Sequence, residues 1–487
     1  MFFLKRKNKG IIIVTALIYG SISAIIIAGL VTWFAGLMNA SRVLLDRERA
    51  FQIAESGIDY YRWHLAHAPQ DFKDGTGNTG PYIHDYFDKD GNKIGQYSLN
   101  ITAPDVGSTI VIVESTGQVS SNPNVYRKIR AKLAIPSLAK FAVLTNEANR
   151  FGEGTVVYGP IHSNGGIRFD GIAYGVISST KASYDDPDHI GAVEFGVHTH
   201  VKNLPATGVL DTFRADEAPP SVIKDRSDVF KAGRQFPVPS FDFAGITTDL
   251  ADVKTKAQSA GKYFTPSGSL GYHVVFKTND TFDLYKVTSF ITVNGACNKN
   301  ENNQDGWGLW SIKTEQFLAN HPNPSNGLLF FEDNVWVNGQ INTARVTLVA
   351  AKYPDNASER KNIIINNDLL YTNKDGRDVI GLIAQNNISV GMVSEDNLEI
   401  DAALVAQNGR IGRFYYKTSQ CITYQFRDTI TLYGMIASNQ RYGFAYTDGN
   451  GYINRYITFD ANLLYNPPPN FPLTSNQYVT LSWDEIK

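Results

Sequence analysis

The clearest pattern along the chain is a long apolar run near the N-terminus. From Ile11 to Met38 no charged residue occurs, and the run follows a basic start between Lys5 and Lys9. At 1.5 Å per residue, about 28 helical residues reach roughly 42 Å, which exceeds the bilayer core of about 30 Å. The pattern predicts a single-pass span of the cytoplasmic membrane, with the N-terminus cytoplasmic and the body of the chain periplasmic or extracellular.

The pattern after this run stays helical and does not resemble the end of a secretory signal. Such a signal has an apolar core of about 7–15 residues and a small-residue cleavage site. No Gly or Pro occurs between Gly36 and Gly57, and apolar residues recur at three- and four-residue steps. These residues are Val43, Leu44, Ala50, Phe51, Ala54, Ile58, Tyr61 and Leu65. We therefore expect one helix over 11–66, apolar first and amphipathic later.

Residues 67–136 show the two-residue alternation of strands and predict a small β-rich module. Strands are expected at 97–102, 109–114 and 126–134. The segment Asp88–Asn92 superficially resembles a calcium-binding loop, but its glycine is misplaced and no Glu closes it. A hairpin turn is the better interpretation.

Beyond residue 137 a short motif recurs, and strand-like segments fall between its copies. The copies begin at Leu348, Leu382, Leu404 and Met435, each followed by Val or Ile and then Ala, with a looser relative at 161–167. A right-handed parallel β-solenoid-like body explains this pattern, because equivalent apolar positions stack from rung to rung and Asn side chains can form ladders. A β-sandwich is the alternative. Overall we predict a mainly β protein behind a long N-terminal helix.

The predicted body has three parts. Residues 137–204 form the first part of the solenoid, and residues 326–487 form its second part with an extended C-terminal cap. Residues 205–325 interrupt the repeat as an inserted α/β subdomain, with a helix within 241–260 and a hairpin around Asn279 and Asp280.

The N-terminal residues resemble type IV prepilins. The basic leader of residues 1–10 ends at Gly10, and the apolar helix starts at Ile11. Segment 50–58, Ala-Phe-Gln-Ile-Ala-Glu-Ser-Gly-Ile, is similar to that of PilX-type minor pilins and K-type minor pseudopilins. The resemblance implies that a prepilin peptidase cuts between Gly10 and Ile11. A plain anchor that is never processed is the alternative.

Two positions depart from the family pattern. The family usually has Phe at the first mature position, where this chain has Ile11, and major pilins have Glu at the fifth, where this chain has Thr15. In that family the glutamate neutralises the ammonium of a neighbouring subunit within an apolar fibre core. Thr15 cannot do so, which favours a minor component over a repeating shaft subunit. The resemblance to K-type pseudopilins implies a place at the tip.

Composition narrows the possible functions. The chain has 487 residues with a net charge of −2, so it has no basic field for a nucleic-acid partner. Its two cysteines are Cys297 and Cys421, which form a disulfide or remain two unrelated thiols.

Candidate chemistry is sparse, so no catalytic residue, metal or cofactor is predicted. His198 and His200 would share one face of a strand, as zinc ligands do, but without an identifiable third ligand we interpret them as surface histidines. Acids of a solenoid enzyme would need to pair on adjacent rungs, and the candidates are Asp378, Asp396 and Asp401. Aromatic residues could stack on a surface glycan or pack internally: Trp307, Trp310, Trp336, Tyr415, Tyr416 and Tyr442.

These observations favour a minor pilin or pseudopilin-like structural component of a type IV pilus or related secretion filament. Its expected partners are the membrane, the prepilin peptidase and other pilins. A membrane-anchored, adhesin-like binding protein is the alternative, and a carbohydrate-active enzyme is less favoured.

Overall fold

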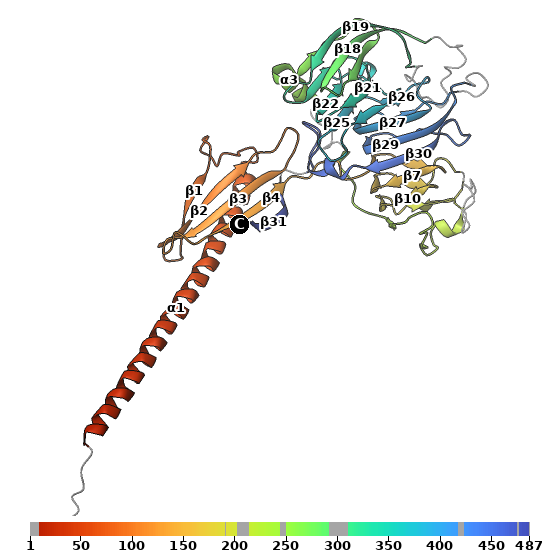
Figure 1. The fold of residues 1–487 in the computed structure, drawn as a ribbon. Helices are drawn as coiled ribbons and strands as arrows, with labels where there is room; N and C mark the ends of the chain where they lie inside the picture. The colour runs from red at the N-terminus through yellow and green to blue at the C-terminus, as the bar shows by residue number, and fades with distance from the viewer. Residues whose placement is uncertain are drawn as a thin grey trace, which may run out of the picture. The chain divides into compact units, whose positions relative to one another are not determined.

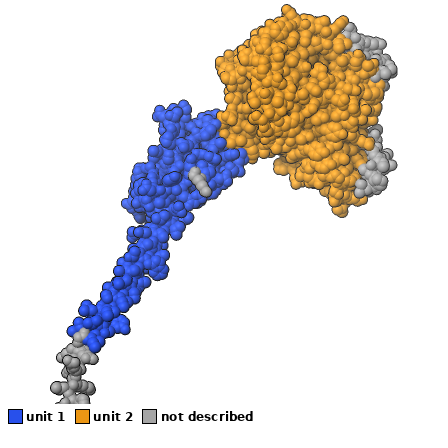
Figure 2. All heavy atoms as spheres, viewed as in Figure 1, with its two compact units in different colours: residues 1–103, 111–133, 477–487 blue, residues 104–110, 134–476 orange. Residues whose placement is uncertain are grey.

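The computed structural model describes residues 9–189, 191–201, 214–243, 250–291, 310–416, 423–474 and 477–486. The chain divides into two compact units (Figure 2). The helix–sheet unit comprises residues 1–103, 111–133 and 477–487, and the stacked-strand unit comprises residues 104–110 and 134–476. The fold is mainly β behind one long N-terminal helix, as the sequence predicts.

The helix–sheet unit is built on α1 (Lys9–His67), whose second half packs on an antiparallel sheet (Figure 1). The helix contributes every third or fourth residue to the core, as its periodicity predicts, while β3 buries every second residue. The strands, in spatial order, are β1 (Tyr82–Phe87), β2 (Lys93–Thr102), β3 (Val111–Val119), β4 (Tyr126–Ala134) and β31 (Val479–Ile486).

Two features of this sheet bear on the sequence predictions. The hairpin is confirmed, since β1 and β2 pair antiparallel and Asp88 Oδ1 accepts hydrogen bonds from the backbone of Asp90 and Asn92. The C-terminus differs from the expected solenoid cap, because β31 lies beside β4 in this sheet. Trp483 of β31 packs edge-on against Phe51 of α1, with ring centroids 5.6 Å apart. A strand at this position pairs the backbone groups of β4 that would otherwise form an open edge.

In the stacked-strand unit, the recurring motifs lie one above another as parallel strands. Leu348, Leu382, Leu404 and Ile436 are successive partners, and so are Ala350, Ala384, Ala406 and Ser438. Three copies of the motif therefore stack in register, as predicted. The copy that begins at Met435 is offset by one residue, so that Ile436 continues the leucine column. The strands of this face, in spatial order, are β16 (Lys262–Phe264), β20 (Leu328–Phe331), β22 (Arg345–Ala350), β25 (Val379–Ala384), β27 (Asn397–Ala406), β29 (Phe426–Ser438), β5 (Val143–Thr145), β8 (Ile161–Ser163), β11 (Ile177–Ser179) and β15 (Arg234–Gln235).

Further strands stack beside this face and close the core. One row contains β17 (Gly271–Phe276), β21 (Val335–Ile341), β23 (Ile363–Ile364), β26 (Ile388–Val390) and β28 (Ile411–Arg413). Another contains β24 (Leu369–Tyr371), parts of β27 and β29, β30 (Gly451–Phe459), β7 (Thr155–Tyr158) and β10 (Ile172–Ala173).

Both sides of the first face are buried. Leu404 and its column partners point into the main core, whereas Val405 packs in a second core with Leu463, Phe471 and α3 (Leu250–Ala260). A strand that is covered on both sides needs apolar residues at successive positions. This explains why the repeat has consecutive apolar residues rather than strict alternation.

The spatial order of the stack differs from the chain order. Strand β5 lies next to β29, so residues 143–235 extend the stack beyond the rung that comes last in sequence. The chain then begins again at the other end with β16. In Figure 1, β18 (Thr281–Phe290) and β19 (Ile312–Pro322) lie near one end of the stack and β7 and β10 near the other.

The region expected as an inserted subdomain contributes directly to this stack. Helix α3 buries Leu250, Val253 and Ala257 as predicted, and the hairpin of β17 and β18 (Thr281–Phe290) is confirmed, with β19 (Ile312–Pro322) as its third strand. However, β15, β16 and β17 pair in parallel with strands of the stack. The apolar side chains of β16 and β17 pack in the same core. By this strand pairing, all three strands are end rungs of the body.

The predicted amide ladders are present at two corners. Asn146 donates to Asn439 at 2.9 Å and accepts from Asn164 at 2.8 Å. A second ladder joins Asn386, Asn362 and Asn334, each step at 3.1 Å.

Candidate assembly helix and candidate metal centre

The first half of α1 is a continuous apolar surface. Residues 11–45 are exposed along the helix. The apolar window of α1 has a mean hydropathy of 2.5 and none of it is buried, so the helix is long and apolar enough to span a membrane. An exposed apolar surface of this length in a folded protein marks a lipid or protein interaction site. The second half of the same helix packs on the sheet, so α1 connects that surface directly to a folded unit.

The residues expected at the processing site lie at the start of this helix. Gly10 lies in the first turn of α1, and the side chain of Ile11 is exposed. Thr15 Oγ1 donates a hydrogen bond to the carbonyl oxygen of Ile11 at 2.8 Å. Its hydroxyl is therefore satisfied within the helix, and the side chain brings no charge to this surface.

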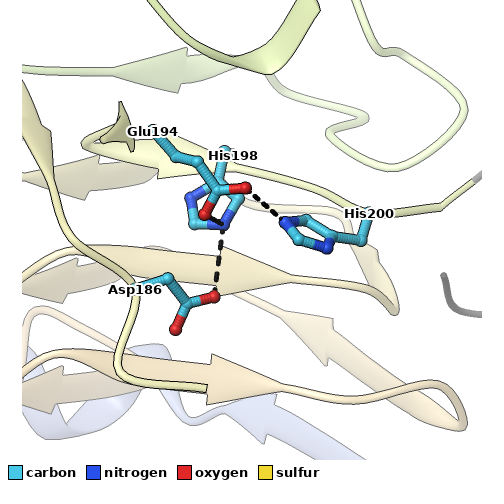
Figure 3. A group of neighbouring side chains, drawn as sticks. All are labelled: Asp186, Glu194, His198 and His200. Atoms are coloured by element: carbon cyan, nitrogen blue, oxygen red, sulfur yellow. Dashed lines mark hydrogen bonds and ion pairs between the residues drawn. The ribbon is translucent and has the colours of Figure 1, made fainter. Parts of the chain in front are cut away.

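A second candidate site lies within the stacked-strand unit, where Asp186, Glu194, His198 and His200 converge (Figure 3). All four residues are buried, so the prediction that the two histidines lie on the surface is wrong. Strands β12 (Ser183–Tyr184) and β13 (Glu194–Phe195) pair antiparallel and place Glu194 near Asp186. Strand β14 (Val197–His198) pairs in parallel with β9 (Ile167–Phe169), which pairs with β6 (Asn149–Phe151).

The four side chains bring their ligand atoms within 4.8 Å of one another. Glu194 Oε1 lies 2.6 Å from His200 Nε2, and Glu194 Oε2 lies 3.0 Å from His198 Nε2. Asp186 Oδ2 lies 3.5 Å from the same nitrogen of His198. Figure 3 shows Glu194 lying between the two imidazole rings and Asp186 approaching from the opposite side of His198.

Three of these atoms have no hydrogen-bond partner among the described residues: Asp186 Oδ2, Glu194 Oε2 and His198 Nε2. The contact between His198 and Glu194 is close, but its alignment is too poor for a hydrogen bond. Buried polar atoms are rarely left in this state, because each one forfeits its hydration. The cluster therefore has the geometry of a site that surrounds a cation.

The electrostatics of the cluster also indicate a need for positive charge. Burial favours the neutral form of Glu194, but the imidazoles of His198 and His200 outweigh it and lower its pKa to about 2. Burial likewise disfavours a charged His198, but Asp186 and Glu194 raise its pKa to about 9. The pKa of Asp186 is lowered, because His198 outweighs the effect of burial. A proton on His198 or a bound cation can meet this need.

Neighbouring groups hold the cluster in place. His198 Nδ1 donates to the carbonyl oxygen of Phe195 at 3.2 Å, and the backbone N–H of His200 donates to Asp170 at 2.8 Å. Asp170 also accepts from Arg168, at 2.7 Å. Gly196 allows the close approach of the hairpin, since a Cβ atom there would lie 1.6 Å from the carbonyl oxygen of Lys181.

The acids considered for an enzyme site have structural partners. Asp378 is buried and accepts from the backbone of Thr343 and Asn373. Asp401 is buried and accepts from the backbone of Tyr371 and from Lys374. Asp396 lies at the surface.

Most aromatic residues considered for glycan stacking pack internally. Trp336, Tyr416 and Tyr442 are buried, whereas Trp310 and Tyr415 are partly exposed. Trp307 and the two cysteines, Cys297 and Cys421, lie outside the described residues.

A cavity of about 1010 Å³ lies along residues 150–155 and 441–455. Its lining includes Arg150, Arg410, Arg441 and Arg455. The guanidinium group of Arg455 donates to backbone carbonyls, among them those of Ile453 and Gly152, so its charge stabilises the surrounding turns.

Comparison with known proteins gives a weak likeness among solved structures. No family model matches the chain, and no curated protein matches its sequence. Among solved structures, the chain is similar to the crystal structure of competence-associated pilin ComZ from Thermus thermophilus, at 13% identity and a TM-score of 0.31. The match covers 91% of this chain and 98% of that one. A TM-score of 0.31 is too low to assign a fold or a function to this chain.

Proposed function

We propose that this protein is a minor pilin or pseudopilin-like structural component of a type IV pilus or related secretion filament. The observation that supports the proposal is the division of α1 into an exposed apolar half and a half that packs on an antiparallel sheet. A filament subunit needs both parts: an apolar segment that resides in the membrane and then among other subunits, and a folded unit that it carries.

The sequence of the apolar half suits both environments. Ala24, Ala28, Thr32 and Gly36 recur every four residues and so lie along one side of the helix. Small residues at this spacing let apolar helices approach closely. In this proposal, lipid covers the segment first and the helices of other pilins cover it after assembly.

The stacked-strand unit would then be the displayed body, outside the cytoplasmic membrane. Asp378 and Asp401 serve the packing of its rungs, so we propose a structural role without enzymatic activity.

A second candidate is a membrane-anchored surface binding protein that is never processed. The cavity of about 1010 Å³, which has Tyr446 and Phe444 in its lining, is the surface on which a glycan would be sought. An exposed apolar helix alone is equally consistent with this candidate.

N-terminal mass spectrometry of the protein from cells that contain the prepilin peptidase tests the proposal. We expect the mature chain to begin at Ile11, and Gly10→Ala to leave most of it unprocessed. Gly20→Ala is the matched control, because a Cβ atom at position 20 of the same helix meets nothing within 4 Å. A native chain that still begins at Met1 would favour the binding protein.

A further inference from the structure

The cluster of Asp186, Glu194, His198 and His200 has a composition that distinguishes it from an ordinary buried ion pair. His198 Nδ1 faces a carbonyl oxygen, which can only accept, so this nitrogen carries a proton. In neutral His198 the lone pair of Nε2 therefore points toward two carboxylate oxygens, at 3.0 and 3.5 Å. Acceptors would then face acceptors in a buried site, which is unfavourable unless a cation lies between them.

The charges and donors match a divalent transition metal. Asp186 and Glu194 bring two negative charges. The guanidinium of Arg168 donates to Asp170 at 2.7 Å and lies 3.8 Å from Asp186 Oδ2, so it offsets only part of this charge. Two imidazole nitrogens disfavour calcium and magnesium, which take oxygen ligands, and favour zinc. A tetrahedral zinc with bonds of about 2.0–2.1 Å keeps its ligand atoms roughly 3.4 Å apart. The ligand atoms of the cluster lie within 4.8 Å of one another, with three contacts at 2.6, 3.0 and 3.5 Å, so the contact between Glu194 and His200 would widen around the ion.

We propose that Asp186, Glu194, His198 and His200 bind one Zn²⁺ ion in a closed, structural site. All four ligands are buried, so no position is open to a substrate. The hydrogen bond from His198 Nδ1 to Phe195 fixes the ring with Nε2 toward the metal, as is usual for zinc ligands.

The proposed ion supplies stability that the local structure lacks. Strands β12, β13 and β14 are two residues long each, too short to hold the segment by backbone pairing alone. Zinc would join the hairpin of β12 and β13 to β14, which pairs with β9 in a separate sheet with β6. Because such a site does not exist in the unfolded segment, the free energy of metal binding contributes directly to the folding of that segment. This role is independent of whether the protein enters a filament.

The full-length protein in detergent allows a direct test. After removal of metals with a chelator, we expect the wild type to take up about one Zn²⁺ per chain, measured by mass spectrometry of metals after gel filtration. Its Tm should rise as zinc is added, since the ion binds only the folded state. Co²⁺ in the same site should give the intense visible bands of tetrahedral coordination.

Variants assign the uptake to this cluster. Glu194→Gln and His200→Asn retain side-chain size and should each weaken zinc binding at least about tenfold. His162→Asn is the matched control. His162 lies in β8 and is also buried, but its ring is hydrogen-bonded to Ser178 and Asn164. We expect this control to bind zinc as the wild type does.

Two results would overturn the proposal. One is zinc uptake by the wild type no greater than that of the Glu194→Gln/His200→Asn double variant. The other is a Tm that does not change when zinc is added to the metal-free protein, because a proton on His198 would then neutralise the two carboxylates without an ion.

Discussion

Gly117 in β3 lies directly against Ala50 in α1: a Cβ atom at position 117 would come within 2.1 Å of the carbonyl oxygen of Ala50. The same atom would lie 2.3 Å from the backbone nitrogen of Ala54. On the helix side, a Cβ atom at Gly57 would lie 2.3 Å from Ser115 Oγ. The segment 50–58 that resembles minor pilins therefore carries the small residues that let the helix and sheet meet at backbone distance.

Gly117→Ala is expected to lower the stability of the helix–sheet unit by at least about 2 kcal/mol, because backbone atoms of α1 cannot move aside without repacking the core. Thermal unfolding of the full-length protein in detergent measures this. Gly36→Ala is the control, since a Cβ atom there meets nothing within 4 Å. Equal Tm values for the two variants would contradict the close packing of α1 on β3.

Leu404→Asp tests the column of stacked side chains. Leu404 is fully buried between Leu382 and Ile436, so a carboxylate there would lose its hydration without a partner. We expect a loss of several kcal/mol in the stability of the stacked-strand unit. Asn397→Asp, at the exposed start of the same strand, should change stability by no more than about 0.5 kcal/mol. A Leu404→Asp variant that melts like the wild type would disprove the stacking.

The pH dependence of the helix–sheet unit should depend in part on Glu114. Its hydrogen bonds with Lys128 and Arg130 on the neighbouring strand lower the pKa of Glu114 below its ordinary value of 4.5. A carboxyl whose pKa is lowered by folding stabilises the protein above its unfolded-state pKa, and this contribution is lost as the pH falls.

The Tm of the wild type should therefore decrease as the pH falls below about 4.5. The decrease should be smaller for the Glu114→Gln variant, which has no carboxylate to protonate at this position. Glu55→Gln, at an exposed position of α1, serves as the control. The Glu55→Gln control should have the same pH profile as the wild type. The assignment to Glu114 fails if the Glu114→Gln variant also has the wild-type profile.

The repeat could be predicted because near-identical residues occupy equivalent rungs. Leu382 and Leu404 are each followed by Ile or Val and then by Ala-Gln-Asn, and they are direct partners in space. The position of β5 beside β29 could not be predicted in the same way, because Val143 and Ile161 continue the column with different residues around them. Backbone pairing sets the register of these strands, so any aliphatic side chain of suitable size can occupy the column. These rungs therefore need not repeat the sequence motif, and the motif does not identify them.

The candidate metal cluster could be predicted only in part from the sequence. His198 and His200 stand out in sequence because alternate residues of a strand share a face. Asp186 and Glu194 join them only through the pairing of β12 with β13, and strands of two residues leave no recognisable alternation. Likewise, β31 pairs with β4 because β4 would otherwise be the edge strand of the sheet. The local sequence of β31 does not indicate this partner.

Thr15 should make this protein a rare component of any filament that contains it. A repeating shaft subunit with threonine at this position would leave one ammonium unpaired at each interface in an apolar core, at a cost of several kcal/mol each. A subunit at the tip has no neighbour above it that requires the carboxylate. Thr15→Glu should therefore leave incorporation into sheared filaments largely unchanged, as quantified by mass spectrometry against the major pilin.

Thr32→Glu is the matched control, because Thr32 bonds to Ala28 as Thr15 bonds to Ile11 but lies far from the N-terminus of the mature chain. A carboxylate there would meet no ammonium in the membrane or the fibre, so this variant should be incorporated poorly. Filaments composed mainly of the wild-type chain would contradict the assignment. Their repeating interfaces would each contain the unpaired ammonium that Thr15, already hydrogen-bonded within its own helix, cannot neutralise.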